Sequence, residues 1–134
     1  MPFVLDACVV ACWAFPDEDH PVADLALSRI QLDHGVVPSL FWFEIRNILL
    51  MGERRKRITS SDTSFFLQRL KTLRTNVDSA SDDDQVLRLA RSHHLTVYDA
   101  TYLELAQRER LPLGTLDREL ARAARAEGVV LLGE

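Results

Sequence analysis

Residues 95–124 read LTVYDATYLELAQRERLPLGTLDRELARAA, and this stretch indicates the fold. It predicts a helix with Asp99 in its first turn, and an apolar strand that gives way at Asp117 to the next helix. In an open α/β sheet, ligands bind beyond the carboxyl ends of the strands. An acid at a strand-to-helix junction therefore stands where chemistry usually happens, and two such acids direct attention to the others in the chain.

The rest of the chain alternates short apolar runs with helical segments. Short strands separated by helices predict a mostly parallel sheet covered by helices on both faces. The expected strands are residues 3–5, 36–37, a short edge strand at Val77, and a terminal strand at 129–132 after Gly128. The expected helices are residues 7–15, 21–34, 40–57 with Ser39 as its cap, a helix capped within 59–62 that runs to about 75, and one from the acids at 82–84 to His93 and His94.

Composition limits the class of protein. A chain of 134 residues that is 47% hydrophobic suits one domain, residues 1–134, with one sizeable core. Sixteen Lys and Arg against twenty Asp and Glu give a net charge of −4, so any polyanion must be met by a local basic patch or by bound cations. The two cysteines are expected to be free thiols. No tract is long and apolar enough to span a membrane, so we expect a soluble, cytoplasmic protein.

Three of the acids have an ordinary structural explanation. Asp6 and Asp117 each follow a strand and precede a helix, which suits an N-cap. Asp99 stands three residues after Thr96, as in a capping box. Capping does not explain Glu44, which lies in mid-helix and follows the spacing of the apolar residues Phe41, Ile48 and Met51. The structural explanation for Glu44 is a buried ion pair with Arg46, Arg54 or a more distant cation.

Taken together, the four acids predict a metal site. Three should lie on the same rim of the sheet, and Glu44 should point from a covering helix toward the core. Like charges about 4 Å apart repel by ~4 kcal/mol at a protein-like dielectric, so a converged set needs divalent cations. Carboxylate-rich ligation suits Mg²⁺ or Mn²⁺, and the absence of a His and Cys cluster argues against zinc. Such ions allow an acidic pocket to bind a phosphodiester and to activate water.

The sequence around these acids resembles the PIN-domain ribonucleases, and among them the VapC toxins of bacterial toxin–antitoxin pairs. The resemblance covers FVLDACVV, FEIRNILL, LTVYDATYLELA and PLGTLDRELARAA, and YDATYLELA followed by TLDREL is its most specific part. It implies a three-layer PIN-like α/β fold and a metal-dependent endoribonuclease that leaves a 5′-phosphate and a 3′-hydroxyl. It also implies a homodimer and a cognate antitoxin protein.

Carried onto this chain, the resemblance gives roles to particular residues. Asp6, Asp99 and Asp117 are expected to hold one or two Mg²⁺ or Mn²⁺ ions, and Glu44 to ligate an ion or orient a water on it. Asn47, one turn after Glu44, is a supporting candidate.

Three further features near these acids are open to two interpretations. Thr115 either bonds a site carboxylate or phosphate or simply bonds backbone at the strand end. Cys8 occupies a position where many relatives have a hydroxyl residue, and packing is the favoured interpretation for it. Arg54, Arg55, Lys56 and Arg57 either complement the end of their helix or guide RNA toward the acids.

Two other classes of function are compatible with parts of the pattern. A haloacid-dehalogenase-type phosphatase needs D-x-D after the first strand, but Cys8 stands at the second position. A phosphoacceptor receiver domain needs paired acids near that strand and a late lysine. A catalytically degenerate PIN-like module would bind RNA or protein without cutting, although all four acids are present.

Overall fold

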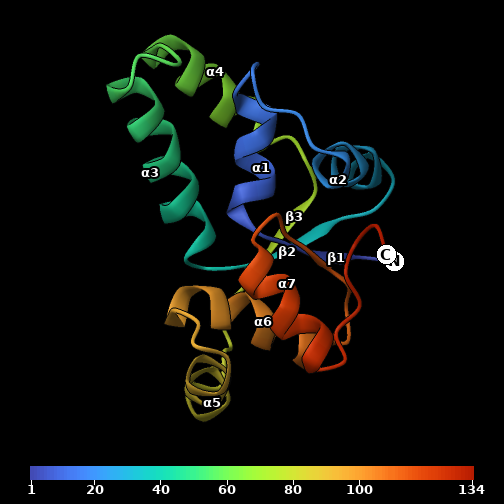
Figure 1. The fold of residues 1–134 in the computed structure, drawn as a ribbon. Helices are drawn as coiled ribbons and strands as arrows, with labels where there is room; N and C mark the ends of the chain where they lie inside the picture. Colours follow the sequence, from blue (N-terminus) through green and yellow to red (C-terminus); the bar gives the residue numbers. More distant parts are fainter.

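The computed structural model describes residues 1–134 and has a four-stranded parallel sheet with helices on both faces (Figure 1). The strand order is β3-β2-β1-β4, so β1 lies between β2 and β4. The strands are β1 (Phe3–Leu5), β2 (Gly35–Pro38), β3 (Thr75–Asp78) and β4 (Leu113–Gly114). The helices are α1 (Ala7–Ala14), α2 (Pro21–Leu32), α3 (Phe41–Arg54), α4 (Ser60–Leu70), α5 (Asp83–His93), α6 (Val97–Glu109) and α7 (Arg118–Ala126). This arrangement confirms the predicted PIN-like α/β architecture.

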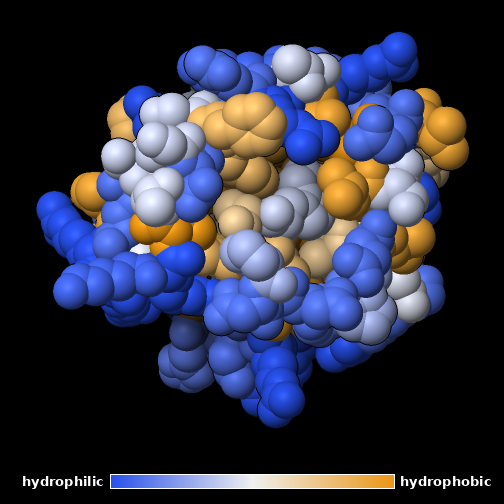
Figure 2. Space-filling view, turned by 90° about the horizontal axis from the view of Figure 1, so that it is seen from above, coloured by the Kyte–Doolittle hydropathy of each residue, from blue (hydrophilic) through white to orange (hydrophobic).

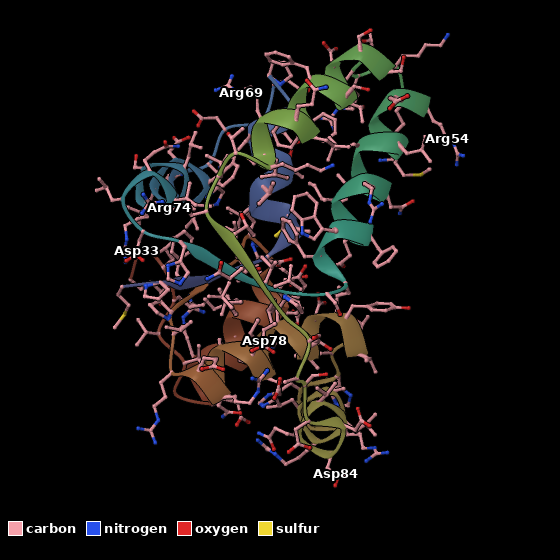
Figure 3. All side chains as sticks on the ribbon, turned by 180° about the vertical axis from the view of Figure 1, so that it is seen from behind. Asp33, Arg54, Arg69, Arg74, Asp78 and Asp84 are labelled. Atoms are coloured by element: carbon pink, nitrogen blue, oxygen red, sulfur yellow. The ribbon has the colours of Figure 1, made fainter.

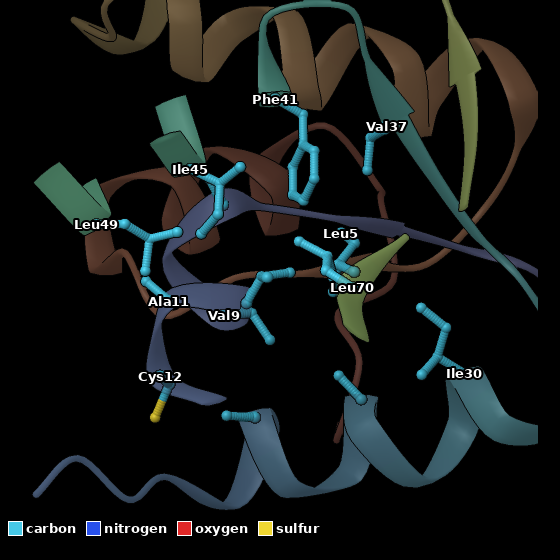
Figure 4. Close-up of a cluster of buried hydrophobic side chains, with 14 of the residues drawn as sticks. Leu5, Val9, Ala11, Cys12, Ile30, Val37, Phe41, Ile45, Leu49 and Leu70 are labelled. Atoms are coloured by element: carbon cyan, nitrogen blue, oxygen red, sulfur yellow. The ribbon is translucent and has the colours of Figure 1, made fainter. Parts of the chain in front are cut away.

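The central strand β1 separates two hydrophobic cores. Successive side chains of a strand point to opposite faces, so Phe3 and Leu5 enter one core and Val4 enters the other. The first core fills the space between the sheet and helices α1 to α4, where Ile45 and Leu70 meet Leu5 (Figure 4). The second core lies under α5, α6 and α7. The all-apolar sequence of β1 follows from this burial on both faces.

The parallel register brings the carboxyl ends of β1 and β4 to one rim. Val4 pairs with Leu113 and Leu5 with Gly114, and the Asp6 amide donates to the Gly114 carbonyl at 3.0 Å. Residues just beyond these strands therefore lie side by side. Figure 1 shows the first turns of α1, α3, α6 and α7 gathered around this end of β1.

The structure differs from the predicted elements near α3. Its N-cap is Leu40, without a side-chain cap bond, so the prediction that Ser39 caps this helix was wrong. Its buried stripe is Phe41, Ile45, Leu49 and Gly52, and Glu44 lies half-buried at the border of that stripe. The predicted stripe through Glu44, Ile48 and Met51 was therefore one position off, and these three residues are only half-buried.

Two other boundaries also moved. Helix α4 begins at its predicted Thr59 cap but ends at Leu70, because Thr75 starts β3 and pairs with Gly35. The expected terminal strand is reduced to one bridge between Leu113 and Leu131.

None of the helices is both long and apolar enough to cross a bilayer. The face seen from above in Figure 2 is hydrophilic at its rim and apolar on the floor of a central hollow.

Candidate active site

Asp6 is the most buried of the four acids and stands at the junction of β1 and α1. It is 5% exposed, and its Oδ2 accepts hydrogen bonds from Thr115 Oγ1 at 2.7 Å and from Cys8 Sγ at 3.1 Å. Burial raises the pKa of Asp6 despite these bonds, and the charge of Asp117 raises it further. Asp6 holds the N-cap position of α1 without a side-chain cap bond. The capping explanation therefore fails for this residue.

Cys8 supports Asp6 directly, which corrects the expectation that it only packs. Besides its bond to Asp6, its sulfur accepts from the Leu116 amide at 3.4 Å and lies 3.8 Å from Thr115 Oγ1. The thiol thus takes the place of the hydroxyl expected at this position, as a weaker donor over a longer distance. Its pKa is raised, first by burial and then by the Asp6 charge.

Thr115 connects Asp6 to Asp117, and its hydroxyl makes both predicted kinds of bond, one to a carboxylate and one to backbone. Its hydroxyl donates to Asp6 and accepts from the Asp117 amide at 3.1 Å. Asp117 Oδ1 accepts from the amides of Glu119 at 2.8 Å and Leu120 at 3.1 Å, so Asp117 is a true N-cap of α7. The other oxygen of Asp117 has no protein hydrogen-bond donor. Capping therefore uses one oxygen of Asp117 and leaves the second available.

Glu44 is held by Tyr102, a residue that the sequence reasoning did not single out. The fully buried Tyr102 hydroxyl donates to Glu44 Oε1 at 2.6 Å and joins α6 to α3. Burial raises the pKa of Glu44 despite this bond, and the charges of Asp6 and Asp99 raise it further. The structural alternative, an ion pair of Glu44 with Arg46, Arg54 or another cation, is absent: no basic nitrogen lies within salt-bridge distance of Glu44, and Arg46 donates to the Trp42 carbonyl. The sequence did contain one signal for Tyr102. It stands three residues after Asp99, and this spacing makes the two residues neighbours on one helix.

Asp99 makes only half of the predicted capping box. Its amide donates to Thr96 Oγ1 at 3.1 Å, but its carboxylate has no hydrogen bond in return. Burial raises the pKa of this half-buried carboxyl, and the charges of Asp6 and Asp117 raise it further. The carboxylate of Asp99 therefore lies near other acids, and Thr96 is the one protein group that partly offsets their effect on its pKa.

The four acids form one electrostatic cluster with no cationic partner. The pKa effects described above link every pair among them except Glu44 and Asp117. No Lys, Arg or His nitrogen lies within 4.0 Å of any of these carboxylates. An all-oxygen set of this kind fits a hard divalent cation. As the side chains stand, however, no three acidic, His or Cys groups are close enough to hold one ion together.

The basic residues at the end of α3 differ in their availability. A hollow of about 360 Å³ runs from Cys8 and Leu116 to Arg55 and Arg57, with Asn47 in its wall. Arg57 donates to Asp17 and Glu18, each at 2.9 Å, and lies 4.1 Å from the centre of the Phe15 ring. Lys56 is exposed, and Arg54 lies at the outer end of α3 in Figure 3. Arg55 is thus the unpaired cation that lines this hollow.

Asn47 lies close to the predicted site without a bond to it. It is exposed on α3 and makes no side-chain hydrogen bond to Glu44 or to any other residue. Its position in the wall of the hollow suits contact with a bound molecule better than support of Glu44.

Known proteins resemble this chain over nearly its whole length. The family described as "PIN domain" matches residues 3–126. Ribonuclease VapC3 of Pyrobaculum aerophilum is 34% identical over 125 residues, which are 90% of this chain and 93% of that protein.

Solved structures share the fold. The crystal structure of PAE2754 from Pyrobaculum aerophilum has a TM-score of 0.72 and 26% identity, with 98% of this chain and 84% of that chain covered. A toxin–antitoxin complex from Klebsiella pneumoniae has a TM-score of 0.56 and 20% identity, with 83% of this chain and 82% of that chain covered. The second likeness concerns the fold alone.

Proposed function

The chain belongs to the PIN-domain family, and from this premise we propose that it is a metal-dependent endoribonuclease acting as the toxin of a toxin–antitoxin pair. The observation that carries the proposal is the cluster of four carboxylates, which repel one another and have no protein cation among them. Likeness to a protein named Ribonuclease VapC3 supports RNA as the substrate. The cytoplasm is then the place of action.

Asp6, Asp99 and Asp117 are the residues that would hold Mg²⁺ or Mn²⁺, with Glu44 beside them. Such an ion supplies a counter-charge for the phosphodiester and lowers the pKa of water that attacks it. Thr115 and Cys8 fix the Asp6 carboxylate, which leaves its other oxygen for the ion. Asp117 has one oxygen engaged as a cap and one available.

Ligation requires small side-chain movements in the cluster. Glu44 is turned to Tyr102, and no three acids share one coordination sphere as they stand. Asp99 and Asp117 each keep carboxylate oxygens that accept no protein hydrogen bond in the hydrogen bonds described above, so these side chains could contribute ligands to an ion held near Asp6.

The neighbouring surface can position a nucleic acid. Arg55 in the hollow beside Cys8 supplies a charge for a backbone phosphate, as does the exposed Lys56. Arg57 contributes less, because Asp17 and Glu18 already compensate its charge. A cognate antitoxin and a homodimer are parts of the same proposal, which the likeness to a VapC protein supports.

Cleavage of end-labelled RNA tests the proposal. The purified protein should make internal cuts with Mn²⁺ or Mg²⁺ and none with EDTA, and the new ends should carry 5′-phosphates. Asp99→Asn should abolish cutting, whereas Asp83→Asn, at the start of α5, is the matched control and should cut normally. RNA that is bound but stays intact under every metal condition would instead identify a non-catalytic binding module.

A further inference from the structure

Three aromatic rings are exposed on this protein, and two of them directly precede site acids. Phe43 is 69% exposed and comes before Glu44, and Tyr98 is 62% exposed and comes before Asp99. The third, Phe65, is 62% exposed and lies on α4. The other aromatic side chains are buried or half-buried. Exposed aromatic rings beside the acids offer flat faces on which a base can stack.

The two rings come from the first turns of two different helices, α3 and α6. Successive residues of a helix differ by about 100° in direction, so each ring lies next to its acid on the outer side. The Tyr102 to Glu44 bond of 2.6 Å fixes the start of α3 against α6. Phe43 therefore borders the cluster from α3 and Tyr98 borders it from α6, and the first turns of both helices face the same rim in Figure 1.

An arginine without an acidic partner accompanies one of these rings. The Arg46 guanidinium carbon lies 5.0 Å from the centre of the Phe43 ring, and Arg46 Nε donates to the Trp42 carbonyl. No carboxylate lies within salt-bridge distance of Arg46, which leaves its terminal nitrogens free for a phosphate oxygen. The Phe43 ring and the Arg46 cation beside it together form a surface that suits a nucleotide.

We propose that Phe43 and Tyr98, which border the acids from two helices, stack on the bases of unpaired nucleotides next to the bond that is cut. This inference rests on the proposed nuclease function and assigns the side chains that would hold the bases and a phosphate of the substrate beside the acids. Bases in a duplex are stacked on each other and cannot offer their faces to these rings, whereas bases of single strands can be splayed onto aromatic side chains. Arg46 binds the phosphate next to the base held by Phe43.

Kinetics on one RNA in two forms test the proposal. The substrate is an unstructured oligonucleotide that the wild-type protein cuts once, used alone or annealed to its complement. Stacking on one aromatic ring supports a KM increase of about 5- to 100-fold for Phe43→Ala or Tyr98→Ala, with a smaller change in kcat. Tyr98→Phe keeps the ring and should recover most of the lost affinity. Phe65→Ala, an equally exposed ring on α4, is the matched control, and the annealed RNA should be cut far more slowly.

A binding experiment separates this inference from the nuclease proposal. RNA with 2-aminopurine beside the cut position is titrated into Asp99→Asn protein, with and without Phe43→Ala, and stacking is read as fluorescence quenching. Cutting that does not depend on either ring overturns the stacking and leaves the nuclease standing. If the quenching depends on the rings but the wild-type protein never cuts RNA, the stacking stands and the nuclease proposal is wrong. If loss of either ring instead changes the oligomeric state in sedimentation, the rings belong to a protein interface and the inference is wrong.

Discussion

Asp6→Asn should stabilise the protein in EDTA and destabilise it relative to wild type in Mn²⁺. The change removes a charge that is buried and surrounded by the other three acids. An asparagine keeps nearly the same shape, and its carbonyl can still accept from Thr115 and Cys8. The variant thus isolates the charge of Asp6 from its packing.

The size of the effect follows from two opposing terms. We take ~1 kcal/mol for the repulsion between Asp6 and each of its three neighbours, because the effective dielectric is ~20 or more and solvent near the half-buried Glu44 and Asp99 screens the charges. The opposing term is the weakening of the two hydrogen bonds from Thr115 and Cys8, which now reach a neutral acceptor. This weakening costs ~1 kcal/mol in total. The free energy of unfolding should therefore increase by ~2 kcal/mol in EDTA.

Urea unfolding at pH 7.5 and low salt measures both arms of this prediction. Bound Mn²⁺ at about 100 times its dissociation constant should add ~2.7 kcal/mol to the wild type and little to the variant, so the order of stability inverts. Asp83→Asn is the control and should respond to Mn²⁺ as the wild type does. A variant that is less stable than wild type in EDTA, or that gains equally from Mn²⁺, would refute the reasoning.

Three more predictions concern protons, the thiol and the basic residues. Because burial and mutual repulsion raise the pKa values of three of the acids, the metal-free protein should gain stability as the pH falls from 7 through those values, since the folded state takes up protons first. Cleavage should fall over the same interval, which a pH profile of kcat/KM measures. Cys8→Ser should keep the bond to Asp6 and retain cleavage, whereas Cys8→Ala should lose ~1 kcal/mol of stability and part of the activity. Arg55→Ala should raise KM and lower the salt dependence of RNA binding by about one unit of slope, while Arg57→Ala should mainly reduce stability in urea unfolding.

The general architecture could be predicted because its signals are local. Strand β1 is apolar at every position and ends at Asp6, and the runs around Asp99 and Asp117 carry helix starts that the structure confirms. The spacing of acids at strand ends indicated that they would meet on one rim. Parallel register then places Asp6 next to Thr115, a long-range contact that the sequence had left as one of two interpretations of Thr115.

Features that depend on contacts between distant elements could not be predicted in the same way. The bond from Tyr102 to Glu44 joins residues 58 positions apart, and the spacing of Tyr102 from Asp99 places it near the acids without indicating that Glu44 is its partner. Cys8 looked like a packing residue because its neighbours in sequence are apolar, yet its sulfur faces Asp6 and the Leu116 amide. Arg57 looked free for RNA, but Asp17 and Glu18 fold back onto it. In each case at least one partner lies far away in the sequence, as Leu116 does for Cys8.

Diffraction from crystals grown with Mn²⁺ tests the central claim most directly, because anomalous scattering locates the ion independently of any activity. We expect a strong anomalous peak between Asp6, Asp99 and Asp117, with their carboxylate oxygens drawn to about 2.2 Å from it, and no peak there in Asp6→Asn. A wild-type crystal saturated with Mn²⁺ that shows no peak at this rim, or a peak only elsewhere on the surface, would contradict the account.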